Sequence, residues 1–260
     1  MIGVYDSGVG GLSVWRELYR IMPEQDYIYV ADGAHCPYGT KPIEFIISRA
    51  DAITRFFLSK GAEVVVIACN TATAAAVDYL RGKYSIPFVG MEPAIKPAAL
   101  ASKSGVVGVL ATANTFKGSL YNNTLEKFAS NVKVIEKVGT GLVECVESGN
   151  TEGEEVDALL HRYVDEMKSE KADAIVLGCT HYPFLEGAIS RIAGEGVRIF
   201  NPAPAVALQT KRIIESLDSP KSSNSRYLFF STGDTKIMRS IVSQIDPILS
   251  DCVFETVVID

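Results

Sequence analysis

The fold is decided by two similar stretches of sequence, VVVIACNTAT at residues 64–73 and AIVLGCTHYP at residues 174–183. In each, a run of β-forming apolar residues ends in a small residue, which is followed by Cys and then by polar residues. The two cysteines, Cys69 and Cys179, lie 110 positions apart (179 − 69). Continuous apolar runs are typical of parallel strands that are buried on both faces. The stretches therefore predict two buried strands, each with a thiol at its carboxyl end.

The repeat extends beyond the two cysteines. IGVYDS (2–7) aligns with VGVLAT (107–112), and PFVGMEPA (87–94) resembles RIFNPAPA (198–205), at nearly the same offset. Each match is weak by itself, since βαβ units share apolar runs for purely physical reasons. That explanation does not account for a cysteine at the same place in both copies. We therefore interpret the chain as two α/β domains of similar build.

Strand-like runs alternate along the chain with stretches of helical spacing, which predicts mainly parallel sheets flanked by helices. We expect residues 1–95 with 205–260 to form the first domain and residues 96–204 the second. The C-terminal part should return to the first domain with a helix, a Ser-rich loop at 219–225, a strand and a further helix. Because ligands of open α/β sheets bind at the carboxyl ends of strands, the active site should lie in the cleft between the domains. The expected strands are at residues 2–6, 26–32, 62–68, 86–91, 105–111, 132–138, 172–178, 197–201 and 226–232.

Composition and charge limit the class of protein. With 260 residues and 47% hydrophobic content, the chain can bury one large core or two small ones. It has no apolar run of membrane-spanning length and no signal peptide, which argues against a membrane protein. Five scattered cysteines suit reduced thiols in a cytoplasm better than a disulfide framework. The net charge of −6, without a Lys/Arg cluster, argues against nucleic acid as a partner.

Both thiols are predicted to lie where a strand gives way to a helix. Cys69 precedes an Ala-rich run, and Cys179 precedes a segment in which Pro183 suits a first helical turn. A helix N-terminus offers free N–H groups that hold a carboxylate and lower the pKa of a thiol. Two thiols on opposite sides of a substrate suit inversion at a carbon, because one removes a proton and the other returns one to the opposite face.

Further candidate residues follow neighbouring strands. DSGVGG (6–11) offers Asp6 as a partner for a thiol, and it offers Ser7 and the glycines as donors to an anion; Ser13 stands where a dinucleotide fingerprint requires Gly. His181, two residues after Cys179, could relay protons. We expect no metal, because the chain has no CxxC pair and its Cys and His residues lack the usual ligand spacing.

The motifs GVYDSGVGGLSV, PYG, ACNTAT and GCTHYP occur in this order. The chain resembles the cofactor-independent aspartate/glutamate racemase superfamily over residues 2 to about 205, and in particular its glutamate-specific members. The resemblance implies two α/β domains that enclose the amino acid, and two cysteines that exchange its α-proton without pyridoxal phosphate or another cofactor. It also implies interconversion of L- and D-glutamate, a supply of D-glutamate for bacterial peptidoglycan, and a homodimer.

The resemblance assigns roles by position. Cys69 would act on the D-enantiomer with help from Asp6, and Cys179 would act on the L-enantiomer with help from His181. Glu147, in LVECVES, would be a further catalytic acidic residue, through a looser motif. Cys36, Cys145 and Cys252 match no motif and are interpreted as structural or incidental. The implied substrate-binding residues are Asp6, Ser7, Tyr38, Gly39, Asn70, Thr71, Thr112, Thr115, Thr180 and His181.

The residues leave three alternatives open. A neighbouring substrate, such as aspartate or a hydantoin, would need only a different pocket depth. A non-catalytic amino-acid-binding or redox-sensing protein could use the same cleft but would not need the second thiol. A thiol-dependent hydrolase could use Cys179 with His181 and would leave Cys69 unexplained. For a racemase, the weakly acidic α-carbon demands positioning and exclusion of water, so we expect domain closure during turnover.

Overall fold

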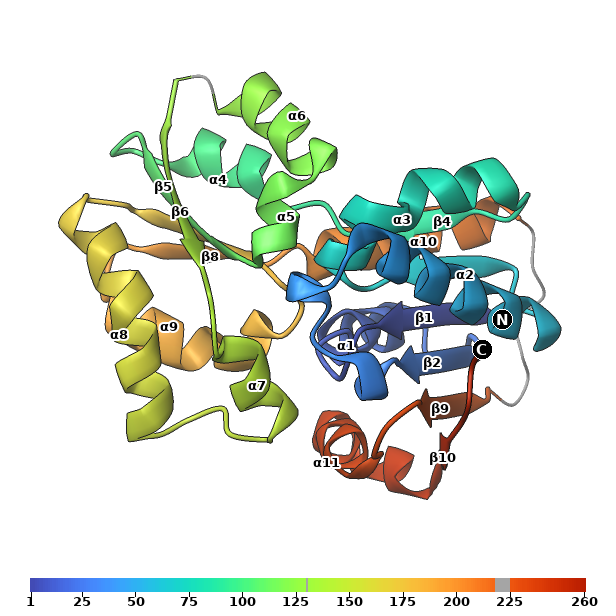
Figure 1. The fold of residues 1–260 in the computed structure, drawn as a ribbon. Helices are drawn as coiled ribbons and strands as arrows, with labels where there is room; N and C mark the ends of the chain where they lie inside the picture. The colour runs from blue at the N-terminus through green and yellow to red at the C-terminus, as the bar shows by residue number, and fades with distance from the viewer. Residues whose placement is uncertain (130, 218–224) are drawn as a thin grey trace.

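The computed structural model describes residues 1–129, 131–217 and 225–260, which form two sheets flanked by helices (Figure 1). Within these residues, every strand pairing in both sheets is parallel. The predicted α/β fold with mainly parallel sheets is confirmed. Most of the Ser-rich loop predicted at 219–225 lies outside the described residues.

The first sheet has six strands in the order β10-β9-β2-β1-β3-β4. One face packs against α1, α10 and α11, and the other packs against α2 and α3. In α2, Ile46, Ala50, Ile53 and Phe57 recur every three or four residues, so the helix turns one apolar face to the sheet. The strands are β1 (Ile2–Asp6), β2 (Tyr27–Ala31), β3 (Val64–Ile67), β4 (Phe88–Gly90), β9 (Tyr227–Ser231) and β10 (Val253–Thr256). The helices are α1 (Leu12–Ile21), α2 (Ile43–Ser59), α3 (Asn70–Lys83), α10 (Ala203–Ser216) and α11 (Lys236–Ile245).

The second sheet has four strands in the order β6-β5-β7-β8. One face packs against α4 and α6, and the other packs against α7, α8 and α9. In α8, buried Val156, Leu160 and Val164 form the apolar face, and acidic residues occupy the first turn, where the helix dipole favours them. The strands are β5 (Val106–Ala111), β6 (Lys133–Val138), β7 (Ala174–Gly178) and β8 (Arg198–Phe200). The helices are α4 (Ile95–Ala101), α5 (Ala113–Lys117), α6 (Ser119–Phe128), α7 (Leu142–Glu147), α8 (Glu154–Ser169) and α9 (Glu186–Ala193).

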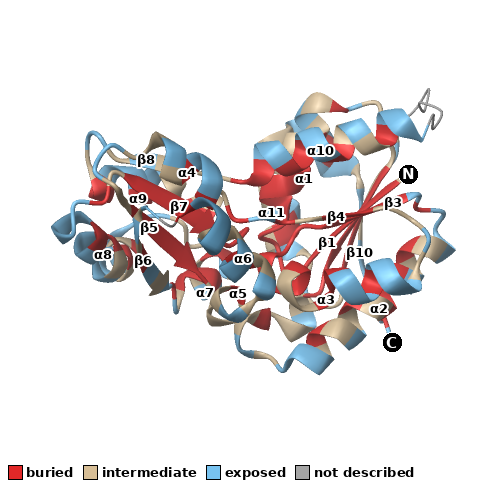
Figure 2. Ribbon diagram, turned by 90° about the horizontal axis from the view of Figure 1, so that it is seen from above, coloured by how far each residue is buried: buried red, intermediate tan, exposed pale blue. Residues whose placement is uncertain are grey.

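The two sheets meet near the carboxyl ends of their central strands. Figure 2 shows that buried residues are concentrated in the strands of both sheets. Hydrogen bonds connect the loops that follow these strands: Ser13 Oγ donates to the carbonyl of Thr180, and Thr71 Oγ1 lies 2.8 Å from Thr112 Oγ1. Asn114 Nδ2 also donates to the carbonyl of Tyr38. In this conformation, the segments that follow β1, β2 and β3 are therefore hydrogen-bonded to the segments that follow β5 and β7.

All nine strands expected from the sequence occur, but the sequence did not indicate β10. This four-residue strand lies at the sheet edge and is mostly exposed, so it carries neither a continuous apolar run nor a clear alternation. In the described ranges, no helix has the length and apolar character needed to cross a membrane.

Candidate active site

A small cavity at the junction of the sheets brings most of the predicted site residues together. Two of the predicted residues, Thr115 and Glu147, lie behind its lining, and two residues that the sequence did not single out, Pro37 and Val143, form part of it. The lining residues are Asp6, Ser7, Pro37, Tyr38, Gly39, Cys69, Asn70, Thr71, Thr112, Val143, Cys179, Thr180 and His181. Both thiols therefore face one space, as the repeat suggested.

Cys69 lies at the N-cap of α3, beside a carboxylate. Its Sγ accepts a hydrogen bond from the backbone N–H of Ala72 at 3.4 Å, and its thiol lies 3.9 Å from Ser7 Oγ. Burial raises the pKa of the Cys69 thiol well above its ordinary value, and the negative charge of Asp6 raises it further. Burial likewise raises the pKa of Asp6. The helix N-terminus does not lower the pKa of Cys69 as expected from the sequence, because burial outweighs it, and this thiol is held as a proton donor.

Cys179 faces an imidazole. Its Sγ lies 3.7 Å from His181 Nδ1, and His181 Nε2 lies 2.5 Å from Glu147 Oε1. Burial acts to lower the pKa of His181, but hydrogen bonds with Cys179, Cys36 and Glu147 outweigh it and raise this pKa well above the ordinary value. Burial acts to raise the pKa of Glu147, but the hydrogen bond and charge of His181 lower it. The result is a buried imidazolium between a thiol and a carboxylate.

The segment after Cys179 differs from the one predicted. No α-helix starts directly after the thiol: a short 3₁₀ helix, Tyr182–Leu185, comes first and contains Pro183, and α9 follows it. Pro183 does occupy the first turn, as predicted, but of the 3₁₀ helix. The positive partner of Cys179 is therefore the side chain of His181 and not the N-terminus of an α-helix.

Asp6 connects the two halves of the site. Its Oδ1 accepts from the N–H of Ser7 at 2.7 Å, and its Oδ2 accepts from the N–H of Gly11 at 2.6 Å. The hydroxyl of Thr180, from the second sheet, also donates to Asp6 Oδ2 at 3.1 Å. The same oxygen lies 4.0 Å from His181 Nδ1. Asp6 is thus in contact with the surroundings of both thiols.

The glycines of DSGVGG allow close approach of side chains from the second domain. A Cβ on Gly8 would lie 1.9 Å from Glu147 Oε1, and a Cβ on Gly10 would lie 2.3 Å from His181 Nδ1. Two backbone donors of this loop bind carboxylates of the protein, since Val9 N–H donates to Glu147 and Gly11 N–H donates to Asp6. The loop therefore positions two carboxylates and one imidazole.

Among the described residues, Asn70 is the one polar residue of the cavity lining whose buried side-chain atoms have no hydrogen-bond partner. Neither its Oδ1 nor its Nδ2 has a hydrogen-bond partner among the described residues, although the residue is only 4% exposed. An unpaired buried amide costs about 1–3 kcal/mol. A polar ligand in the cavity would remove this cost, because the amide can both donate and accept.

Tyr38 and Thr115 are less directly available to a ligand. The Tyr38 hydroxyl donates to Asp32 Oδ2, and Arg49 binds the same carboxylate, so the ring of Tyr38 is held in place by its own domain. Thr115 Oγ1 lies 2.9 Å from Thr112 Oγ1, behind the cavity wall. Tyr38 therefore contributes a wall, and Thr115 positions the hydroxyl of Thr112.

The cavity is closed in this conformation. Its volume is about 10 Å³, which is enough for about one water molecule. A second cavity of about 80 Å³, also lined by Thr140, Glu144 and Tyr182, shares four lining residues with it: Pro37, Gly39, Thr112 and Val143. An amino acid therefore requires the walls of the first cavity to move apart.

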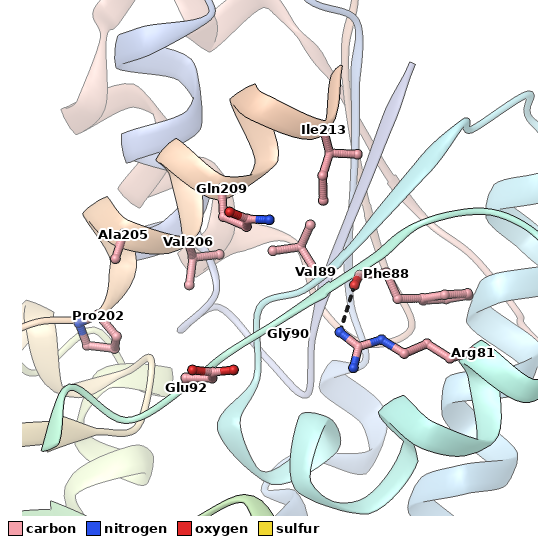
Figure 3. Close-up of a pocket in the computed structure, with 10 residues that line it drawn as sticks. All are labelled: Arg81, Phe88, Val89, Gly90, Glu92, Pro202, Ala205, Val206, Gln209 and Ile213. Atoms are coloured by element: carbon pink, nitrogen blue, oxygen red, sulfur yellow. Dashed lines mark hydrogen bonds between the residues drawn. The ribbon is translucent and has the colours of Figure 1, made fainter. Parts of the chain in front are cut away.

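A larger cavity, of about 440 Å³, lies elsewhere, between β4, α10 and the end of α3 (Figure 3). Its charged side chains are Arg81 and Glu92, and the guanidinium of Arg81 donates to the carbonyl of Phe88. It contains neither thiol nor any of the predicted site residues. Volume alone therefore does not identify the reactive site.

Residues 11–210 match the Asp/Glu/Hydantoin racemase family. The chain belongs to this family. The chain is 45% identical to a glutamate racemase of Ectopseudomonas mendocina over 93% of this chain and 92% of that protein. It is 44% identical to one of Herpetosiphon aurantiacus over 90% of this chain and 92% of the relative.

Solved structures of racemases in this family share the complete fold. A glutamate racemase isoform from Bacillus anthracis superimposes with a TM-score of 0.86 at 30% identity, covering 100% of this chain and 97% of its own. The Escherichia coli glutamate racemase, solved with L-glutamate and the activator UDP-MurNAc-Ala, also has a TM-score of 0.86, at 32% identity and with 100% and 98% coverage.

The sequence did not reveal several residues that shape the site through contacts between distant segments. Ser13 donates to the carbonyl of Thr180 and so connects the two halves of the site. Asp32 holds Tyr38, and Val143 lines the cavity from α7. The position of Val143 directly after Leu142 in the LVECVES stretch was a usable signal. Nothing local marks Ser13, which the sequence showed only as a departure from a dinucleotide fingerprint.

Proposed function

We propose that the protein interconverts L- and D-glutamate by removing and returning the α-proton, with Cys69 and Cys179 as the two acid/base residues. The observation that carries this proposal is the cavity itself. Two thiols from matched positions of two parallel sheets line it together with Asn70, whose buried amide has no partner among the described residues. The high identity to glutamate racemases over most of the chain supports glutamate as the substrate.

For L-glutamate, the thiolate of Cys179 takes the α-proton, and the electron pair passes into the substrate carboxylate. The thiol of Cys69 then donates its proton to the opposite face of the α-carbon, which leaves a thiolate at Cys69 and a thiol at Cys179. The imidazolium of His181, 3.7 Å from Cys179, stabilises the thiolate there. Burial and Asp6, which raise the pKa of Cys69, keep its proton available for donation. D-glutamate follows the same steps in reverse.

The remaining lining residues suit a zwitterionic amino acid. The hydroxyls of Ser7, Thr71, Thr112 and Thr180 and the amide of Asn70 provide neutral donors and acceptors around one small space. Neutral partners can bind the ammonium and both carboxylates without fixing the α-carbon between opposite charges. Because the closed cavity is far smaller than glutamate, turnover on this proposal includes opening and closure of the two domains.

We also propose the boundaries and setting of the enzyme. The first domain is residues 1–95 with 205–260, and the second is residues 96–204. Support comes from β9 and β10, which extend the sheet of β1–β4, and from α10, which packs on the same face of that sheet as α1.

A cytoplasmic location and a homodimer follow the family resemblance, as does a role in supplying D-glutamate for peptidoglycan. The five cysteines are free, which suits a reducing compartment.

The test is proton NMR of L-glutamate and, separately, D-glutamate in deuterated buffer with purified enzyme and no added cofactor. We expect loss of the α-proton signal together with formation of the opposite enantiomer. If aspartate loses its α-proton and glutamate does not, the mechanism is retained and the substrate is wrong. If neither amino acid exchanges, while glutamate still protects the thiols from alkylation, the protein binds the amino acid without racemising it and the proposal is overturned.

A further inference from the structure

Cys36 joins two of the site residues in a cluster that the sequence spacing did not reveal. One ligand atom each from Cys36, Glu147 and His181 can be chosen so that all lie within 4.8 Å of one another. Within residues 1–129, 131–217 and 225–260, this is the one group of three or more His, Cys, Asp or Glu side chains with that property. The three residues come from the loop after β2, from the end of α7 and from the loop after β7.

The cluster is packed against a backbone that leaves room for it. A Cβ on Gly8 would lie 1.9 Å from Glu147 Oε1 and 2.9 Å from Cys36 Sγ. His181 is 1% exposed, whereas Glu147 and Cys36 are half-buried. The cluster therefore combines one fully buried ligand with two that are partly exposed to solvent.

We propose that Cys36, Glu147 and His181 form a binding site for a thiophilic divalent cation of the zinc type, and that its binding stops racemisation. Thiolate, imidazole and carboxylate are the three ligand types that zinc uses in proteins, and three protein ligands leave a fourth position for water. Hard cations such as magnesium and calcium prefer oxygen-only sites. The inhibitory effect rests on the proposed racemase function, whereas the binding does not.

The distances are compatible with this ion after a small adjustment. Zinc bonds of about 2.0–2.3 Å in a tetrahedral arrangement place ligand atoms roughly 3–4 Å apart. The 2.5 Å contact between His181 Nε2 and Glu147 Oε1 must therefore open by about 1 Å, through rotation of the Glu147 side chain. On binding, the thiol proton of Cys36 and any proton on His181 Nε2 pass to the solvent.

Binding at this position would interfere with the chemistry from one side of the imidazole ring. His181 Nδ1 faces Cys179 at 3.7 Å, and Nε2 faces Glu147. A cation on Nε2 takes the place of the proton there and breaks the direct contact with Glu147, so His181 is no longer the imidazolium that the proposed reaction uses beside Cys179. It leaves Cys69 and the thiol of Cys179 uncoordinated. Inhibition should therefore depend on Cys36, which the proposed reaction does not use.

The experiment compares the wild-type enzyme with Cys36→Ala and Cys36→Ser, and with Cys252→Ala as a control thiol outside the cluster. Equilibrium dialysis with zinc chloride measures binding, and racemisation at increasing zinc concentration measures inhibition, each variant relative to its own metal-free rate. We expect one zinc ion per chain in the wild type and in Cys252→Ala. The zinc concentration that halves the rate should rise at least about tenfold in both Cys36 variants. EDTA should restore activity, which distinguishes binding from thiol oxidation.

Cobalt(II) provides a reading that does not depend on activity. The wild type should show a thiolate-to-cobalt charge-transfer band in the near ultraviolet, and both Cys36 variants should lack it. If the band and the inhibition persist in the Cys36 variants, and the band disappears in Cys179→Ser, the ion binds the catalytic thiols and the proposal is wrong. Absence of zinc binding to the wild type would also overturn it. If the protein binds zinc through Cys36 but does not racemise glutamate, the site stands and the proposed function fails.

Discussion

The two thiols occupy equivalent places in two similar sheets, yet their chemical surroundings differ. Cys69 caps an α-helix and has a hydroxyl and a buried carboxylate as neighbours, Ser7 and Asp6. Cys179 precedes a short 3₁₀ helix and has an imidazole as its neighbour, which Glu147 holds from behind. The repeated backbone places the two thiols symmetrically, and the surrounding side chains then give each thiol a different partner.

This difference gives the two faces of the substrate different partners. Burial and Asp6 raise the pKa of Cys69 and keep its proton available, while the imidazole of His181 lies 3.7 Å from Cys179 Sγ. Each thiol therefore has its own group beside it for proton transfer. Because the two enantiomers of glutamate have equal free energy, kcat/KM must nevertheless be the same in both directions. A difference between the two thiols can therefore be detected only in the rates of the individual proton transfers.

The largest effect is expected from removing either thiol. Cys69→Ser and Cys179→Ser should each lower kcat/KM for both enantiomers by about 10³-fold or more, since a hydroxyl is a far weaker acid than a thiol at neutral pH. Coupled assays for D- and L-glutamate measure the rates, and Cys252→Ser serves as the control. If one variant kept the rate of the wild type, the two-thiol mechanism would be wrong and the two half-sites would not be functional counterparts.

The partners of the thiols should be distinguishable by isotope effects. His181→Asn should lower kcat/KM about 10²-fold in both directions and make proton transfer at Cys179 limiting. The α-deuterium isotope effect should then be larger from L-glutamate, where Cys179 breaks the labelled bond. Asp6→Asn should show the opposite pattern, with the larger effect from D-glutamate.

His161→Asn is the matched control for the imidazole, because His161 is exposed on α8 and pairs only with Asp165 among the described groups. It should leave rates and isotope effects unchanged. Equal isotope effects from both enantiomers, in both His181→Asn and Asp6→Asn, would contradict separate roles for the two partners.

The parts of this comparison that could be predicted are those encoded locally. Continuous apolar runs followed by Cys69 and Cys179 predicted the strands and the shared cavity, because strand burial and residue order are properties of a few neighbouring residues. Asp6 and His181 were also proposed from their places after strands, and the ordered motifs added the family and, with it, Glu147. The exposed edge strand β10 has no such local pattern and was missed.

The remaining features depend on distances between segments remote in sequence. The cluster of Cys36, Glu147 and His181 joins two loops and the end of α7, and the hydrogen bond from Ser13 to Thr180 connects the two halves of the site. The pKa of Cys69 could not be inferred from its helix N-terminus, because burial and Asp6 decide it. The closed cavity is likewise a property of domain arrangement and not of any motif.

A smaller effect is expected from Asn70, which lines the cavity between the two half-sites. Asn70→Ala should raise KM for both enantiomers by about tenfold, since it removes a polar partner worth about 1–3 kcal/mol to a buried ligand. The free energy of unfolding should fall only by the contribution of the lost side-chain packing. The substitution breaks no hydrogen bond, because both polar atoms of Asn70 lack partners among the described residues. Kinetics and urea denaturation measure the two quantities, with the exposed Asn123→Ala as a control. A large loss of stability with unchanged KM would show that Asn70 is structural.

The smallest effect should come from Glu147, which acts on Cys179 only through His181. Glu147→Gln keeps a side chain of the same shape but replaces the carboxylate whose hydrogen bond helps to raise the pKa of His181 with a neutral amide. Activity that needs protonated His181 is present below this pKa and is lost as the pH rises through it. The alkaline limb of kcat/KM should therefore move to lower pH, with a loss of about tenfold or less at neutral pH.

Glu144→Gln removes an exposed carboxylate from the same helix and should leave the limb where it is in the wild type. A purely structural role for Glu147 would lower the rate at every pH by the same factor. A shift confined to the alkaline limb of kcat/KM would instead show that Glu147 acts through the protonation of His181, on the Cys179 side of the site. The group beside Cys179 is an imidazole whose pKa Glu147 helps to raise, whereas the proton on the Cys69 side is controlled by burial and by Asp6, whose hydrogen bonds from Ser7 and Gly11 remain in Glu147→Gln.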